Sequence, residues 1–281
     1  MEIKTVGVCG AGTMGSGIAQ VAAAAGFATI LYELNGAQLE AAQQKLQQDL
    51  QALVKKGKIA DEKKATILQN ITFTSDITQC RADLIIEAIV EKPEIKTALF
   101  NQLAGINSSQ TIFASNTSSL SITALGKTLP QPQNFAGLHF FNPAPLMKLV
   151  EVVKGEQTSN AVVQTLMAFT GAVGKTGVLC KDAPGFIVNR VARPYYIESL
   201  RLAEEGLGDY ATIDKLLESH GFKMGPFKLM DLIGNDINYA VSCSVYDQLG
   251  QPERLKPSYL QKEKVDHNQL GKKTGSGYYN Y

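Results

Sequence analysis

His139 and Glu151 are the two residues of this sequence whose types and spacing best suit proton transfer. Segment 135–143 predicts a strand whose end carries His139 and Asn142, and segment 148–153 predicts a second strand that contains Glu151. If these strands are neighbours, the carboxylate can hold one imidazole nitrogen while the other nitrogen accepts a proton. The carboxylate would also stabilise the imidazolium that forms. A histidine among aromatic side chains is more often a packed core residue, so the carboxylate partner is what favours catalysis here.

A glycine-rich turn between a predicted strand and a predicted helix indicates a nucleotide site. The strand Thr5–Cys9 is short and apolar, and it leads into the sequence GAGTMG. Gly10 permits a sharp turn, Gly12 lets the backbone approach a pyrophosphate, and Gly15 lets the next helix lie near the strand. That helix begins at about Met14 and directs its free N–H groups and positive dipole end at the phosphates. A plain strand-to-helix turn could use the same glycines, but the flanking elements favour the nucleotide interpretation.

Glu33 indicates which dinucleotide this turn would bind. The alanine-rich helix 18–25 ends at Gly26, and the next predicted strand, 28–32, is followed directly by Glu33. A carboxylate at this position can accept both hydroxyls of an adenosine ribose. It would repel a 2′-phosphate, and segment 34–36 offers no arginine to hold one. The sequence therefore predicts NAD rather than NADP as the cofactor.

Polar side chains also follow two further predicted strands, 82–88 and 111–115. Glu91 and Lys96 come after the first of these strands, and the hydroxyl-rich run 116–119 comes after the second. Ligands of open α/β sheets collect at the carboxyl ends of the strands. The hydroxyl-rich run could also supply a helix N-cap, and we expect one of these serines to do so.

Segments 36–57 and 61–69 predict a helical hairpin that is larger than a dinucleotide fold requires. Apolar residues recur at three- and four-residue steps along the first helix, which predicts one buried side. Lys55, Lys56 and Lys58 lie near the turn of this hairpin. Such lysines usually form a solvated face, whereas a substrate that carries phosphates would give them a function.

The composition changes at residues 182–185, and we place a domain boundary there, between residues 1–182 and 183–281. Segments 187–203, 211–219 and the region after Pro226 have helical patterns, so the second domain is predicted to be α-helical. Asn189 lies early in its first helix. The amide could satisfy local backbone groups or point into a cleft between the domains.

The overall composition is that of an ordinary globular protein. The chain has 281 residues, is 44% hydrophobic and carries a net charge of +1, so no partner held by bulk charge is expected, neither nucleic acid nor membrane. Its four cysteines are widely scattered without metal-ligand spacing, which predicts free buried thiols and no metal site. The N-terminus enters the first strand without a targeting pattern, and no apolar run could span a bilayer. These features predict a cytoplasmic protein.

Taken in order, these segments resemble the L-3-hydroxyacyl-CoA dehydrogenase family, especially its bacterial 3-hydroxybutyryl-CoA dehydrogenase branch. The resemblance extends along the whole chain. It rests on GAGTMGSGIAQ at 10–20, SNTSSLSIT at 115–123, HFFNPAPLMKLVEVV at 139–153, APGFIVNR at 183–190, MGPF at 224–227 and KKTGSGYY at 272–279. It implies an α/β Rossmann-type N-terminal domain with a long helical hairpin insertion, plus an all-α C-terminal domain.

The resemblance also implies roles for individual residues. His139 resembles the catalytic base and Glu151 its orienting partner, while Ser118 and Asn189 resemble the residues that bind the substrate's 3-oxygen. Lys56 matches a lysine that binds CoA phosphates. Ala52 and Asp49 depart from the family pattern near it, which predicts weaker or differently arranged CoA contacts. The implied NAD contacts are Gly10, Gly12, Thr13, Met14, Gly15, Glu33, Glu91, Lys96, Asn142 and Lys273.

The resulting functional hypothesis is an NAD-dependent (S)-3-hydroxyacyl-CoA dehydrogenase that uses 3-hydroxybutyryl-CoA or acetoacetyl-CoA and forms a homodimer through its helical domain. Two alternatives stay open. The same fold and His–Glu pair could oxidise a small polyol or sugar acid without CoA, or the chain could be a non-catalytic, crystallin-like NAD-binding protein.

Overall fold

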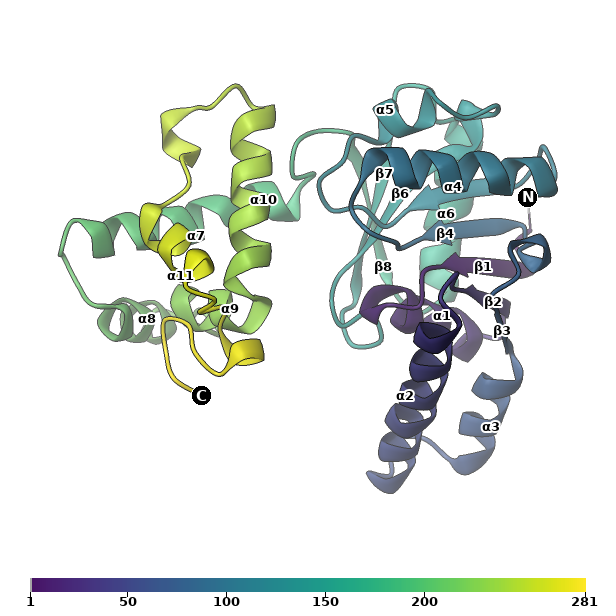
Figure 1. Cartoon of the computed structure of the whole chain (residues 1–281), viewed down its shortest axis with the longest axis horizontal. Coiled ribbons are helices and arrows are strands. Elements are labelled where there is room, and N and C mark those ends of the chain that lie inside the picture. The colour runs from purple at the N-terminus through teal and green to yellow at the C-terminus, as the bar shows by residue number, and fades with distance from the viewer. Residues whose placement is uncertain (1) are drawn as a thin grey trace. The chain divides into compact units, whose positions relative to one another are not determined.

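The computed structural model describes residues 2–281, and the chain divides into two compact units. The first unit ends at Asp182 and the second is Ala183–Tyr281. The first is an α/β unit and the second is built of helices, so the predicted fold class is confirmed (Figure 1). Each unit is described below by itself.

Across residues 2–281, eight strands form one sheet in the order β3-β2-β1-β4-β5-β6-β7-β8. Neighbouring strands are parallel except β6 and β7, which are antiparallel. The chain continues from β1 to β2 on one side, while β4 pairs with β1 on the other, so the strand order reverses at β1. Such a reversal leaves a crevice at the carboxyl ends of the two central strands. The strands are β1 Thr5–Cys9, β2 Ala28–Tyr32, β3 Ile71–Thr74, β4 Leu84–Glu87, β5 Ile112–Ser115, β6 Phe135–Phe140, β7 Leu149–Lys154 and β8 Thr176–Lys181.

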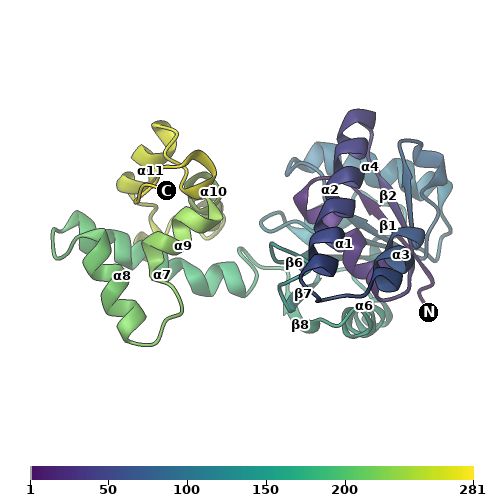
Figure 2. The ribbon, with the colours of Figure 1, turned by 90° about the horizontal axis from the view of Figure 1, so that it is seen from below.

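Helices cover both faces of the sheet, because its strands are apolar on both sides (Figure 2). Val6 and Val8 belong to the core on the face covered by α1 and α6. Phe113 and Phe135 point to the other face, where their rings meet Phe100 of α4. Successive residues of a strand alternate between faces, so this packing fixes which side each polar strand residue takes. The helices of the unit are α1 Thr13–Ala24, α2 Gly36–Lys55, α3 Asp61–Gln69, α4 Pro93–Ile106, α5 Ile122–Gly126 and α6 Asn160–Ala172, with 3₁₀ turns η1 Ile77–Gln79 and η2 Pro132–Asn134.

Helices α2 and α3 form the predicted hairpin, which extends away from the sheet (Figure 1). Four of the recurring apolar positions of α2, Leu39, Ala42, Leu46 and Leu50, are buried, as their spacing predicts, and Leu53 is half-buried. The Asn35 side chain caps the start of α2 by accepting from the Gln38 N–H at 3.2 Å. Strand β3, which follows the hairpin, was not predicted, because four residues at a sheet edge give too short an alternation to recognise.

The second unit packs its helices around Tyr196, Leu200, Phe227 and Met230. Asp231, only 1% exposed, ties the C-terminal segment to this core. None of the helices between residues 2 and 281 combines the length and apolar character that a membrane crossing needs. The helices of this unit are α7 Val188–Glu204, α8 Tyr210–Ser219, α9 Pro226–Ile233, α10 Asn235–Gln248 and α11 Tyr259–Asp266, with 3₁₀ turns η3 Glu253–Leu255 and η4 Lys272–Thr274.

Asp231 accepts hydrogen bonds from the backbone N–H groups of Tyr278 and Tyr279, both at 3.0 Å, and from the side chain of Asn235 at 2.8 Å. We expect Asp231→Ala to lower the free energy of unfolding of this unit by about 3 kcal/mol, because buried donors lose their acceptor. Tyrosine fluorescence in a urea titration would measure this, since the chain has no Trp and, of its ten Tyr, only Tyr32 lies in the first unit. The exposed Asp266 of α11 gives the control Asp266→Ala, and equal losses in the two variants would contradict the assignment.

Candidate active site

The antiparallel pairing of β6 and β7 brings His139 and Glu151 together. The two residues are direct partners in the register, and the His139 Nδ1 lies 2.8 Å from the Glu151 Oε2. Their side chains are 7% and 1% exposed, respectively. An ionised carboxylate can only accept, so Nδ1 carries the proton in this contact, and proton exchange with a ligand falls to Nε2. The ring of Phe141, with its centroid 4.5 Å from that of His139, packs beside the imidazole. The geometry therefore matches the predicted pair.

The glycine-rich turn joins β1 to α1 as its sequence predicts. Gly10 has φ +101°, in the region that favours glycine, and its N–H donates to the Tyr32 carbonyl at 2.8 Å. A Cβ on Gly15 would lie 1.8 Å from the Gly10 carbonyl oxygen, so only glycine lets α1 start this close to β1. A Cβ on Gly12 would meet nothing within 4 Å, which leaves the space that a pyrophosphate would occupy.

The start of α1 and the side chain of Glu33 fit a dinucleotide. Gly12 is the N-cap of α1, no side chain caps the helix, and its first turn contains no acidic residue, so its N–H groups suit an anion. Glu33 accepts from the Ala11 N–H at 3.0 Å and from the Asn35 N–H at 3.1 Å. A carboxylate has about four acceptor positions, so Glu33 can also take ribose hydroxyls.

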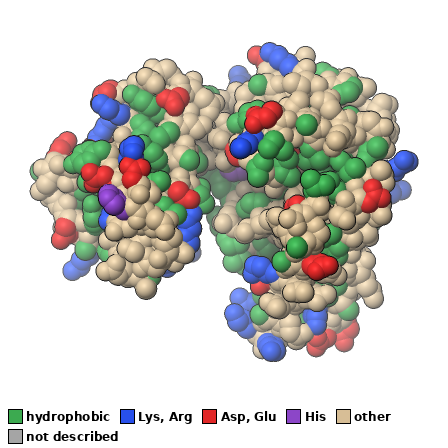
Figure 3. All heavy atoms as spheres, viewed as in Figure 1, with side chains coloured by type: hydrophobic (Ala, Val, Ile, Leu, Met, Phe, Trp, Pro, Cys, Tyr) green, Lys and Arg blue, Asp and Glu red, His purple; other side chains and the backbone are tan. Residues whose placement is uncertain are grey.

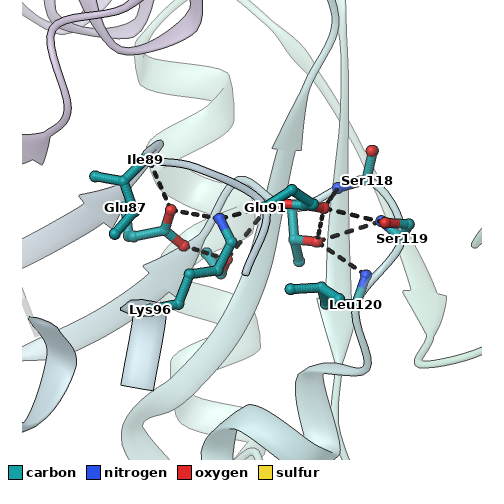
Figure 4. A network of polar contacts seen from close by, with 9 residues as sticks. Glu87, Ile89, Glu91, Lys96, Ser118, Ser119 and Leu120 are labelled. Atoms are coloured by element: carbon teal, nitrogen blue, oxygen red, sulfur yellow. Dashed lines mark hydrogen bonds and ion pairs between the residues drawn. The ribbon is translucent and has the colours of Figure 1, made fainter. Parts of the chain in front are cut away.

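A buried network of charges lies at the carboxyl end of β4 (Figure 4). Lys96 of α4 is 1% exposed, and its Nζ lies 2.5 Å from the Glu87 Oε1 and 3.0 Å from the Glu91 Oε2. Glu87 also accepts from the Ser115 hydroxyl at 2.6 Å and from the Ile89 N–H at 2.7 Å. Burial raises the pKa of Glu87 above its ordinary value, against the opposing effect of Lys96. Lys96 therefore serves two carboxylates, and its predicted contact with the cofactor stays a prediction.

Glu91 organises the turn that carries Ser118. Its Oε1 accepts from the hydroxyl of Thr117, from the Ser118 N–H at 3.2 Å and from the Ser119 hydroxyl at 3.1 Å. Burial would raise the pKa of Glu91, but Lys96 and these donors outweigh it and hold that pKa below its ordinary value. The hydroxyl of Ser118 takes no part in the network and points away from Glu91 (Figure 4). The helix cap is made by Ser121, just after the run 116–119, which accepts from the Ala124 N–H at 3.1 Å.

The remaining predicted residues are described by their own elements. Asn142 is exposed just beyond the end of β6, and Lys56 is exposed at the C-cap of α2. Asn189 and Lys273 belong to the second unit. Asn189 lies in the first turn of α7, and Lys273 pairs with Asp236, with 2.6 Å between the Lys273 Nζ and the Asp236 Oδ1.

Glu87 and Ser115 were not recognised as site residues from the sequence. The signal was a carboxylate at the end of the otherwise apolar strand 82–88, where an acidic side chain is almost never fully buried without a partner. Its partner, Lys96, lies nine positions later on a helix, and local sequence patterns do not show which charges meet.

Two family matches cover nearly the whole chain. Residues 5–183 match the family described as 3-hydroxyacyl-CoA dehydrogenase, NAD binding domain, and residues 185–281 match the one described as 3-hydroxyacyl-CoA dehydrogenase, C-terminal domain. The first unit is thus an NAD-binding domain, and the cofactor predicted from Glu33 and the glycine turn is confirmed.

Individual relatives agree with this assignment. The chain is 46% identical over 283 residues to the 3-hydroxyadipyl-CoA dehydrogenase of Escherichia coli strain K12, a match that covers 100% of this chain but only 60% of that protein. It is 42% identical over 287 residues to the mitochondrial hydroxyacyl-coenzyme A dehydrogenase of Sus scrofa, covering 99% and 91% of the two chains. A solved (S)-3-hydroxybutyryl-CoA dehydrogenase from Ralstonia eutropha has a TM-score of 0.95 at 36% identity, over 100% of this chain and 99% of that one.

We expect Lys96→Met to lower the free energy of unfolding by about 3 to 5 kcal/mol, because it leaves Glu87 buried without its charge partner. In the double variant Glu87→Gln, Lys96→Met, the loss of free energy of unfolding should be clearly smaller than the sum of the losses in the two single variants. Urea unfolding followed by circular dichroism would measure the three losses.

The exposed pair Lys45 and Asp49 on α2, with an N–O distance of 3.1 Å, is the matched control. Lys45→Met should cost less than about 1 kcal/mol. Strictly additive losses at Glu87 and Lys96 would show that the two charges do not depend on each other.

Proposed function

The chain belongs to the 3-hydroxyacyl-CoA dehydrogenase family, and from this premise we propose that it is an NAD-dependent (S)-3-hydroxyacyl-CoA dehydrogenase acting on 3-hydroxybutyryl-CoA and acetoacetyl-CoA. The contact of 2.8 Å between His139 and Glu151 is the observation that carries this proposal. When bound, NAD supplies the acceptor for the hydride that leaves C3 of the acyl group, and NADH supplies that hydride in the reverse direction.

In the proposed reaction, the His139 Nε2 takes the proton of the substrate's 3-hydroxyl, and in reverse the imidazolium returns a proton to the 3-oxygen. Glu151 holds Nδ1 and stabilises the positive charge that His139 gains. The side chains of Ser118 and Asn189 donate hydrogen bonds to the same oxygen, where negative charge develops.

The cofactor would be held mainly by backbone groups of the first unit. The start of α1 presents N–H groups to the pyrophosphate, and Glu33 accepts the hydroxyls of the adenosine ribose. Glu91 and Asn142 are placed at the carboxyl ends of β4 and β6, where the nicotinamide half is expected. The full set of proposed NAD residues is Gly10, Gly12, Thr13, Met14, Gly15, Glu33, Glu91, Lys96, Asn142 and Lys273.

The free end of the α2–α3 hairpin is the proposed binding region for the CoA phosphates. Lys and Arg side chains gather there (Figure 3). Lys55, Lys56 and Lys58 are all exposed at this end. Asp49 lies about two turns before Lys56 on α2 and is paired with Lys45. Its negative charge is therefore partly balanced rather than left to repel a phosphate.

The identity of 46% to a 3-hydroxyadipyl-CoA dehydrogenase favours a second candidate substrate, 3-hydroxyadipyl-CoA. The chemistry at C3 would be the same, because only the far end of the acyl chain differs. A terminal carboxylate would require a cation or hydrogen-bond donors where butyryl-CoA ends in a methyl group. The homodimer and the cytoplasmic location remain predictions.

We expect His139→Gln to keep NADH binding while losing about 3 kcal/mol or more of transition-state stabilisation, a hundredfold or greater loss of turnover, because the proton acceptor is gone. Glu151→Gln should lose less turnover than His139→Gln, since the amide of Gln can still orient the imidazole but no longer stabilises its positive charge. Glu156→Gln is the control, because Glu156 is exposed and pairs with Lys127 instead. Unchanged turnover in His139→Gln would remove the assignment.

A substrate comparison separates the candidate functions. We expect kcat/KM for NADH oxidation to be about a hundredfold or more higher with acetoacetyl-CoA than with free acetoacetate. The reason is that the lysines at the hairpin end can bind the CoA phosphates, which free acetoacetate lacks. NADH should be preferred to NADPH by about tenfold or more, because Glu33 repels a 2′-phosphate. Comparing kcat/KM for 3-oxoadipyl-CoA with that for acetoacetyl-CoA decides which of the two acyl chains is preferred. Equal rates with free acetoacetate would favour a CoA-independent dehydrogenase, and NADH binding without any turnover would favour a non-catalytic protein.

A further inference from the structure

The segment Asn142–Met147, here called the β6–β7 loop, joins the strand of His139 to the strand of Glu151. Most of it is exposed, but Ala144 is buried. Within the loop, the N–H groups of Leu146 and Met147 both donate to the Pro143 carbonyl at 3.0 Å. These two bonds make a turn, but they do not connect the loop to the rest of the unit. Other contacts must therefore hold the loop in place.

Lys175, between α6 and β8, makes one set of these contacts. Its ammonium donates to the carbonyls of Ala144 at 2.7 Å, Met147 at 2.8 Å and Pro145 at 3.3 Å. A lysine ammonium has three protons to donate, and the three carbonyls of this loop can accept all of them. Hydrogen bonds from a charged group are stronger than those between neutral groups, so Lys175 fastens this loop firmly. Burial lowers the pKa of Lys175, which is consistent with an ammonium partly removed from water.

Gly17, in the middle of α1, makes the second close approach to the loop. A Cβ built on Gly17 would lie 3.1 Å from the Pro145 Cδ and 3.2 Å from the Ala144 Cβ, closer than ordinary van der Waals contact. Gly17 is helical, so no backbone conformation requires a glycine here. A glycine inside a helix costs about 1 kcal/mol relative to alanine. The close approach of the β6–β7 loop is therefore the physical reason for the glycine.

The β6–β7 loop thus touches α1, the helix whose N-terminus suits the cofactor phosphates, and continues directly from the strand that carries His139. We propose that Gly17 and Lys175 are positioning residues, which clamp this loop onto α1 and so fix His139 and Asn142 relative to the cofactor. This inference rests on the proposed function. Neither residue was assigned a role from the sequence, and neither is expected to touch the substrate.

The test compares Gly17→Ala and Lys175→Met with matched controls. Gly105→Ala replaces another helical glycine, in α4, where a Cβ would meet nothing within 4 Å. Lys154→Met removes a lysine whose ammonium donates to the Asn160 side chain at 2.6 Å instead of to the loop. Lys175→Arg keeps a charged donor and should retain most of the activity.

With acetoacetyl-CoA and NADH, we expect kcat to fall about fivefold in Gly17→Ala and about tenfold or more in Lys175→Met, because small displacements of a catalytic group slow the reaction steeply. The KM for acetoacetyl-CoA should stay within about twofold, since neither variant removes a group proposed to bind the substrate. Hydrogen exchange measured without ligands should be about tenfold faster at the Leu146 and Met147 N–H groups in both variants, but not in the controls.

Several outcomes would overturn the positioning role. One is that the wild-type protein is active and both Gly17→Ala and Lys175→Met keep its kcat. Another is that hydrogen exchange in the loop of these variants is no faster than in the controls. The third is that Lys175→Arg loses as much kcat as Lys175→Met. If Gly17→Ala fails to fold, the comparison of Lys175→Met with Lys175→Arg decides alone. A wild-type protein that turns over no 3-oxoacyl-CoA would instead overturn the proposed function, and the exchange measurement separates the two failures.

Discussion

The register between β6 and β7 is the constraint on which the rest of the site depends. His139 and Glu151 lie beside each other because they are direct partners in the antiparallel register of these two strands. A slip of one residue would turn one of the two side chains to the opposite face of the sheet. Leu138 and Val152, which are fully buried on that opposite face, oppose such a slip because it would expose or displace them. Apolar packing on one face therefore aligns the polar pair on the other.

The buried charges at the end of β4 follow a related logic. Removing Glu87 and Lys96 from water costs free energy, which their contact and the donors from Ser115 and Ile89 offset. A buried ion pair is weak evidence for stability, but it requires a defined geometry. Here that geometry extends through Glu91 to the turn that carries Ser118. The network therefore connects a helix, two strands and a turn at the edge of the sheet where the cofactor is expected.

Most of the elements could be predicted from the sequence because their patterns are local. The ends of β1, β2 and α3 agree with their predicted positions, since caps, glycines and periodicity mark them within a few residues. Strand β3 was missed because an edge strand of four residues carries little periodic signal. Of the site, the glycine turn, Glu33 and the His139–Glu151 pair were predictable, because each follows from a strand and what comes directly after it. Glu87 was not, since burial of a charge depends on a partner in another element.

The sequence by itself determined the residue types and their placement within elements, and so the NAD-binding motif and the family. Chemical groups and local periodicity are properties of short segments, and they persist wherever those segments lie in the fold. Only the tertiary structure decided which distant groups meet: Lys96 between two carboxylates, Lys175 on the loop after β6, and the close approach of that loop to Gly17. Such contacts depend on the order of the strands and on the packing of helices against them, which no short segment encodes alone.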